Sequence, residues 1–263
     1  MSALTSFVLA CGTHPRRDPV LDDASPAPDA PVVVDARPAP DAPGCCGTGL
    51  ECDNCVDDDG DGLIDGDDPH CSSGLDDAEG SFHGGFPVNI DPSRQDCYFD
   101  GNTGAGDDGC IFHVCCVLDE CPPELQSGFD PTRCVPSAEC VQRCLPMTTP
   151  GCDCFGCCTA CNENGCFDVL LSEWVSGDCT VATLHDPAAC LPCTRRPECS
   201  RGACGGATCI TCRGQTDADL DPACPARVCP DGLPACSDGC ECADGEYCAT
   251  GCCVSATFGP WPP

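Results

Sequence analysis

Residues Asp57 to Asp68 read DDDGDGLIDGDD, and seven of these twelve residues are aspartate. Like charges at this density repel one another unless a cation lies among them. Counted from Asp57 as position 1, oxygen-bearing side chains occupy positions 1, 3, 5, 9 and 12, and glycine occupies position 6. The stretch therefore predicts a loop that folds around a hard cation, and we expect the rest of the chain to be arranged about it.

This spacing resembles the register of an EF-hand calcium loop. Calcium is favoured over magnesium because a flexible, carboxylate-rich loop suits six to eight oxygens at variable distance. The predicted ligands are the side chains of Asp57, Asp59, Asp61 and Asp65, the backbone carbonyl of Leu63, and Asp68 at position 12. The alternative is a solvated acidic turn without an ion.

The loop departs from the EF-hand pattern in two ways. Position 12 is Asp68 where the pattern has glutamate, and no amphipathic helix precedes or follows the loop. The shorter side chain predicts weak affinity, roughly 10⁻⁴–10⁻³ M, and a structural role. Cys55 and Cys71 lie just outside the two ends, so we expect a disulfide between them to replace the helices, worth about 3 kcal/mol in the loop-entropy model. We treat His70 as a chance neighbour.

Thirty-five cysteines among 263 residues, with only 5% aromatic residues, are typical of a disulfide scaffold in an oxidising compartment. We therefore expect a small disulfide-rich fold, mostly irregular, with short β-hairpins, little helix and a disordered N-terminal tether. Because the pairing of so many cysteines cannot be deduced from spacing, the connectivity stays open.

The net charge of −32 comes from 43 acidic residues against 11 basic ones, all of them arginine. Such a surface repels nucleic acid and attracts cations, so nucleic acid is excluded as a partner. The five histidines show no HExxH spacing, and the sequence contains neither a GxSxG elbow nor a phosphate-binding GxxxxGK[ST] loop. We expect no enzymatic activity.

Residues 1–10 end in an apolar segment before Cys11, and the sequence VLAC resembles the bacterial lipobox, which predicts lipidation of Cys11. No basic residue precedes the cysteine, so either the true start lies upstream or the resemblance is accidental. Removing Cys11 leaves 34 cysteines, an even number suited to disulfides. Gly12 after the cysteine implies, by the lipoprotein sorting rule, the outer membrane.

The chain divides by composition into a series of segments. They are a truncated signal segment (1–10), a Pro/Ala/Asp-rich tether (11–44), a calcium-loop module (45–80), a Cys/Gly-rich module (81–145), a cysteine-rich module with a candidate hairpin (146–216), a knot-like module (217–254) and a loose tail (255–263).

Two of these segments carry further candidates. A second cation site is predicted at Asp100, Asn102, Asp107 and Asp108, the alternative being a glycine-rich turn held by Cys97 and Cys110. Alternation from Phe167 to Leu171, a Ser-Gly-Asp turn, and then Val181 and Leu184 predict a β-hairpin. The same stretch can be interpreted as a short helix through Leu170, Leu171, Trp174 and Val175.

Two alternative functions remain open. Residues 224–254 hold eight cysteines and resemble whey-acidic-protein and related inhibitor modules through a CC pair, which predicts a secreted protease inhibitor. Five CxxC pairs suggest a thiolate metal-binding protein, although an oxidising compartment favours disulfides.

Taken together, VLAC, the tether and CVDDDGDGLIDGDDPHCSSGLDDAE make residues Val8 to Glu79 similar to myxobacterial-type cysteine-rich surface lipoproteins, whose calcium loops resemble thrombospondin type 3 repeats. The resemblance implies a non-enzymatic, calcium-binding lipoprotein at a Gram-negative cell surface, or a secreted one. It would be anchored in the membrane by its N-terminal lipid and would serve a structural, adhesive or recognition role toward a protein or surface glycan.

Overall fold

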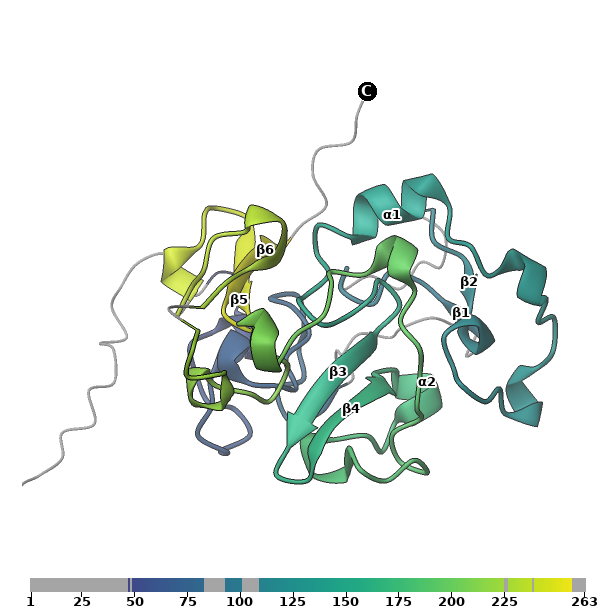
Figure 1. Cartoon of the computed structure of the whole chain (residues 1–263), viewed down its shortest axis with the longest axis horizontal. Coiled ribbons are helices and arrows are strands. Elements are labelled where there is room, and N and C mark those ends of the chain that lie inside the picture. The colour runs from purple at the N-terminus through teal and green to yellow at the C-terminus, as the bar shows by residue number, and fades with distance from the viewer. Residues whose placement is uncertain are drawn as a thin grey trace, which may run out of the picture. The chain divides into compact units, whose positions relative to one another are not determined.

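A computed structural model describes residues 47, 49–82, 93–100, 109–224, 227–237 and 239–256 (Figure 1). All of them belong to one compact unit, Pro40–Pro263. The predicted signal segment, the lipidation site Cys11, the tether and the tail beyond residue 256 lie outside the described residues. Within the described ranges, no helix has the length and apolar character needed to cross a membrane.

The strands of the described residues form antiparallel pairs, each a separate two-stranded sheet. They are β1 (Arg94–Gln95) with β2 (Phe112–His113), β3 (Cys157–Asn162) with β4 (Gly165–Leu170), and β5 (Glu246–Ala249) with β6 (Cys252–Ser255). In two of these hairpins a tight turn joins the strands, with Asn162 opposite Gly165 and Ala249 opposite Cys252. The expected short β-hairpins are confirmed.

Helical structure is short throughout the described chain. The longest helix is α1 (Ala138–Cys144), where the Ser137 hydroxyl accepts the Cys140 N–H at 3.0 Å as an N-cap. A second helix, α2, covers Glu173–Ser176. The remaining turns are 3₁₀ segments: η1 (Glu51–Asp53), η2 (Asp65–Asp67), η3 (Val114–Cys116), η4 (Pro123–Leu125), η5 (Pro131–Arg133), η6 (Val181–Thr183), η7 (Pro197–Cys199), η8 (Gly206–Thr208), η9 (Asp217–Asp219), η10 (Pro230–Gly232) and η11 (Gly239–Glu241).

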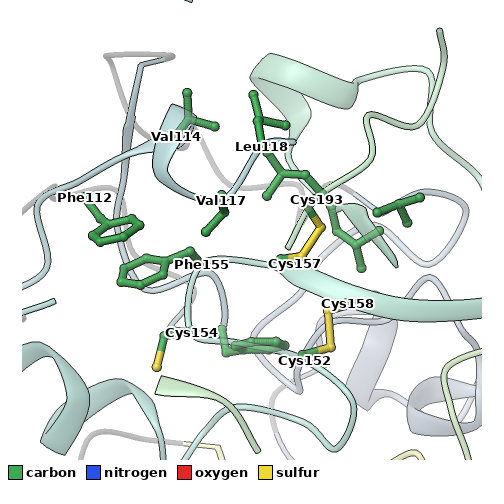
Figure 2. Close-up of a cluster of buried hydrophobic side chains, with 14 of the residues drawn as sticks. Phe112, Val114, Val117, Leu118, Cys152, Cys154, Phe155, Cys157, Cys158 and Cys193 are labelled. Carbon is green, nitrogen blue, oxygen red and sulfur yellow. A yellow bond between two sulfur atoms is a disulfide. The ribbon is translucent and has the colours of Figure 1, made fainter. Parts of the chain in front are cut away.

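The main core is built as much from cystine as from hydrocarbon. The Phe112 and Phe155 rings stack at 4.0 Å between centroids, and the Cys157–Cys193 and Cys152–Cys158 disulfides lie close by (Figure 2). This buried cluster extends from Phe82 to Cys199, so residues on both sides of Leu145 share one core. Sulfur thus supplies interior volume that the few aromatic residues cannot.

Fifteen disulfides join thirty of the described cysteines, and Cys55 and Cys240 are also disulfide-bonded. The pairs are 52–71, 97–144, 110–140, 115–121, 116–134, 152–158, 154–199, 157–193, 161–166, 179–190, 204–212, 209–224, 229–252, 236–248 and 242–253. The disulfide-rich fold class is confirmed, and bonding on this scale indicates an extracytoplasmic protein.

The predicted disulfide between Cys55 and Cys71 is wrong, because Cys71 pairs with Cys52. Cys52 is fully buried in turn η1 and donates its N–H to the Asp76 carbonyl at 3.3 Å, which holds it beside Cys71. Cys55 is exposed, in a left-handed conformation with φ 59°. The disulfide that closes the loop therefore begins at Cys52, three residues before the predicted Cys55.

The proposed closure of a glycine-rich turn by Cys97 and Cys110 is also wrong. These two cysteines bond to Cys144 and Cys140, which lie four residues apart on α1. Residues i and i+4 share one face of a helix, so α1 receives both bonds on its buried side.

The strand in the 146–216 segment exists, but its predicted partner is wrong. Strand β4 pairs with the preceding β3, and the Cys161–Cys166 disulfide crosses the turn between them. After β4 the chain forms helix α2 and turn η6 rather than a second strand. The helical interpretation is correct only for Glu173–Ser176, because Leu170 ends β4.

Candidate cation site

The aspartate loop is held by its own backbone. Asp57 accepts the N–H of Gly60 through Oδ1 at 2.6 Å and that of Gly62 through Oδ2 at 3.1 Å. Both glycines have positive φ, 82° and 97°, which L-residues with a side chain rarely adopt. The glycines at these positions therefore let the loop turn back on the first aspartate.

Three of the predicted ligands converge. Asp59, Asp61, Asp68 and His70 each offer one atom, and these atoms all lie within 4.8 Å of one another. Two carboxylate charges at this distance repel by about 1 kcal/mol in bulk water and by about 3 kcal/mol at an effective dielectric constant near 20. A cation among the three carboxylates would convert this repulsion into attraction.

Asp68 is the decisive member of the group, because it is only 2% exposed. Its Oδ1 accepts the backbone N–H of His70 at 2.6 Å, whereas its Oδ2 is buried with no hydrogen-bond partner among the described residues. Burying an ionised oxygen without a partner is costly, and native proteins rarely do so. A bound cation would give this oxygen a partner.

His70 is not a chance neighbour, because its backbone N–H bonds Asp68 and its ring is fixed beside the loop. Its Nε2 accepts the Val181 N–H at 3.3 Å, which places the proton of the neutral ring on Nδ1. Nδ1 lies 3.2 Å from Asp68 Oδ1 without forming a hydrogen bond to it, and the ring packs 4.9 Å from that of Phe82. Because Nδ1 carries the proton and Nε2 accepts the Val181 N–H, neither ring nitrogen has a lone pair left for a metal. The candidate donors are therefore oxygens, which calcium and magnesium prefer.

Asp65, a predicted ligand, lies in the loop but outside the converging group of side chains, and the backbone carbonyl of Leu63 stays a predicted ligand. The Asp65 carboxylate accepts the N–H of Asn54 at 3.0 Å and that of Cys55 through both oxygens, at 3.2 and 3.0 Å. Burial raises the pKa of Asp65 to about 6. Leu63 donates its N–H to Asp61 Oδ1 at 2.8 Å. Asp65 thus fastens the loop to the chain before it.

Glu79, which the sequence analysis did not single out, organises the loop from inside. It is fully buried, and its two oxygens accept the N–H of Asp58 at 2.5 Å and that of Asp65 at 2.8 Å. Burial raises the pKa of Glu79 to about 6, and the charges of Asp68 and Asp65 add to the shift. The sequence shows an acidic residue after the loop, but it does not show that this residue is buried.

The second predicted cation site cannot be assembled here. Asp100 is described and buried, whereas Asn102, Asp107 and Asp108 lie outside the described residues.

The thiolate alternative finds no thiolate in the described chain. The sulfurs of Cys236, Cys242 and Cys248 lie within 4.8 Å of one another, but all three are in disulfides. A half-cystine carries no thiolate to offer a metal. The same bonds frame the exposed turn η11 of the C-terminal segment, and protease inhibition by residues 224–254 stays a prediction.

Comparison with known proteins gives no match: no family model, no curated protein and no solved structure is similar to this chain. The site is therefore interpreted from the chain's own residues, and the resemblance to cysteine-rich surface lipoproteins stays a prediction.

Proposed function

We propose that this protein is a non-enzymatic, calcium-binding extracytoplasmic protein in which the ion has a structural role. The observation that carries the proposal is the buried Oδ2 of Asp68, which has no hydrogen-bond partner among the described residues, in a side chain that converges with those of Asp59 and Asp61. A divalent cation held by these three side chains would satisfy the buried oxygen and the repulsion among the carboxylates together.

Calcium is the ion that best suits the donors. Three carboxylates on a flexible loop suit the irregular shell of six to eight oxygens that calcium accepts. Magnesium demands near-ideal octahedral geometry and is usually held by one or two carboxylates and several waters. The loop is local and largely exposed around a single buried ligand, so we expect weak affinity, in the range of roughly 10⁻⁴–10⁻³ M found in extracellular modules. An ion bound so weakly is retained only where calcium is abundant.

We further propose that the protein is a surface lipoprotein or a secreted protein, carried by lipidation of Cys11 and a tether over residues 11–44. The disulfide content supports an oxidising location, and the lipobox-like VLAC supports the anchor. In this setting the calcium-stabilised unit would serve structure, adhesion or recognition toward a protein or glycan. Cys11→Ser should abolish incorporation of labelled palmitate in a bacterial host, and unchanged labelling would exclude this anchor.

Titration calorimetry of the full chain tests the calcium site. The double variant Asp59→Ala with Asp61→Ala should lose the calcium heat, because it removes two of the three converging carboxylates. Asp58→Asn is the matched control, since Asp58 lies in the same loop but outside the group. Equal heats from the wild type and the double variant would exclude the site.

A further inference from the structure

Turn η2 of the calcium loop packs directly on strand β5, and Figure 1 shows the two side by side. Gly66, in the middle of η2, lies so close that a Cβ there would stand 1.7 Å from the Cys248 carbonyl oxygen and 3.2 Å from Tyr247 Cζ. No real Cβ fits at such distances, so backbone meets backbone at this point. The loop therefore cannot shift relative to the β5–β6 hairpin unless this contact opens.

Tyr247 reinforces the contact from the hairpin side. It is 4% exposed, and a Cβ at Gly74 would lie 2.9 Å from its Cδ2. Two glycines, Gly66 in the loop and Gly74 beyond it, thus make room for one aromatic ring. The ring is buried by the calcium-loop module, although it belongs to a strand more than 170 residues away in the sequence.

The residues after the loop are fixed on another side. Arg213, only 1% exposed, donates from one guanidinium nitrogen to the carbonyls of Pro69 at 2.9 Å and Cys71 at 2.6 Å. Its other terminal nitrogen donates to Thr149 Oγ1 at 3.3 Å. The chain beyond Asp68 is therefore anchored to the central core, whereas η2, before Asp68, has its anchor at Asp65, on the side away from Asp68.

Asp68 and η2 form one turn. The Asp68 N–H donates to the Asp65 carbonyl at 2.9 Å, and Asp68 lies two residues after Gly66. A movement of the Asp68 backbone would therefore also move Gly66, the residue that touches β5.

We propose that occupancy of the calcium site regulates how firmly the β5–β6 hairpin is held, a coupling that rests on the proposed function. With the ion bound, Asp68 is drawn toward Asp59 and Asp61, and η2 keeps Gly66 against Cys248. Without it, repulsion among the three carboxylates displaces Asp68, and the contact between η2 and β5 loosens. In this proposal, bound calcium stabilises the contact between the loop and the C-terminal β5–β6 hairpin.

Thermodynamic linkage makes the coupling testable from both ends. If calcium raises the equilibrium constant for closing the hairpin contact by some factor, the closed contact must raise the calcium affinity by the same factor. For coupled sites this factor is roughly 5- to 150-fold. A substitution at the contact, far from any ligand oxygen, must then weaken calcium binding.

The experiment uses the full chain with its disulfides intact. Amide hydrogen exchange is followed by NMR in 10 mM calcium chloride and in EDTA, and calcium affinity is measured by calorimetry for the wild type and three variants. Calcium should slow exchange of the β5 and β6 amides about five-fold or more, while the β3 and β4 amides change less. Gly66→Ala should weaken calcium binding by a similar factor, Gly74→Ala should weaken it less, and the exposed control Val228→Ala should leave it unchanged.

The two proposals fail in distinguishable ways. If the wild type binds calcium but the β5–β6 amides exchange at the same rate with and without it, the coupling is overturned and the calcium site stands. If the wild type shows no calcium heat, both are overturned. Should Gly66→Ala not fold, the wild-type exchange and the affinity of Gly74→Ala decide the question.

Discussion

Asp68→Asn should have opposite effects on stability in the absence and in the presence of calcium. In EDTA the variant removes one charge from three that lie within 4.8 Å, and with it two repulsive pairs of about 1–3 kcal/mol each. The bond that Asp68 Oδ1 accepts from the His70 N–H can be kept by the asparagine side-chain oxygen. The calcium-free variant should therefore be as stable as the wild type or more stable.

In calcium the order should reverse. At 10 mM calcium and a dissociation constant of about 10⁻⁴–10⁻³ M, binding stabilises the wild type by roughly 1.4–2.7 kcal/mol. For a chain of this size that corresponds to a rise in Tm of about 3–10 °C. Asp68→Asn should gain little, because its side chain no longer supplies the buried carboxylate oxygen.

The assay is thermal unfolding followed by near-ultraviolet circular dichroism in EDTA, calcium and magnesium at equal ionic strength. Guanidinium is added equally to all samples if the transition lies too high to record. Asp58→Asn, which removes one charge from the same loop, should keep the calcium-dependent rise. An equal rise for Asp68→Asn and the wild type would refute the reasoning, as would a variant that is less stable than the wild type by the same amount in EDTA and in calcium.

Three further predictions concern the scaffold of the loop and of the main core. Glu79→Gln should cost about 1–3 kcal/mol in guanidinium unfolding, because an amide can accept only one of the two N–H bonds that the carboxylate accepts; an unchanged midpoint would contradict this. Burial raises the pKa of Asp153 to about 6, so the folded state binds its proton more tightly than the unfolded state. Its contribution to stability should therefore fall as pH rises from about 4 to 6, and Asp153→Asn should flatten that part of a plot of unfolding free energy against pH. Replacing Cys52 and Cys71 together by alanine should cost about 3 kcal/mol in chemical unfolding, whereas a loss near zero would show that the loop needs no disulfide.

The fold class could be predicted from composition, because 35 cysteines and few aromatic residues leave little choice of interior. The pairing could not. Both Cys52 and Cys55 lie a few residues before the loop, so spacing alone does not say which of them pairs with Cys71. The burial of Cys52 in turn η1 decides it. The partner of β4 was mistaken for a similar reason: alternation identifies a strand but does not say on which side in sequence its neighbour lies.

The site was predicted in part. In this loop the carboxylate of an aspartate accepts the N–H of the residue two positions later: Asp59 accepts that of Asp61, and Asp61 accepts that of Leu63. These local bonds fold the chain so that Asp59 and Asp61 come together. The contributions of His70 and Glu79 depend on contacts with Val181 and with the interior, which lie far away in sequence or are invisible in it. Asp65 occupies a ligand position in the spacing, but the N–H groups of Asn54 and Cys55 bind its carboxylate.

The cystine content of the core has a consequence for the life history of the chain. A core such as that around Phe112 and Phe155, in which half-cystines take the places of aliphatic side chains, offers the reduced polypeptide little to collapse around. Newly made chain should therefore stay unfolded while its thiols are reduced, which is the state that translocation across a membrane requires. Formation of the disulfides would then start folding, and the protein would fold only after it has reached an oxidising compartment.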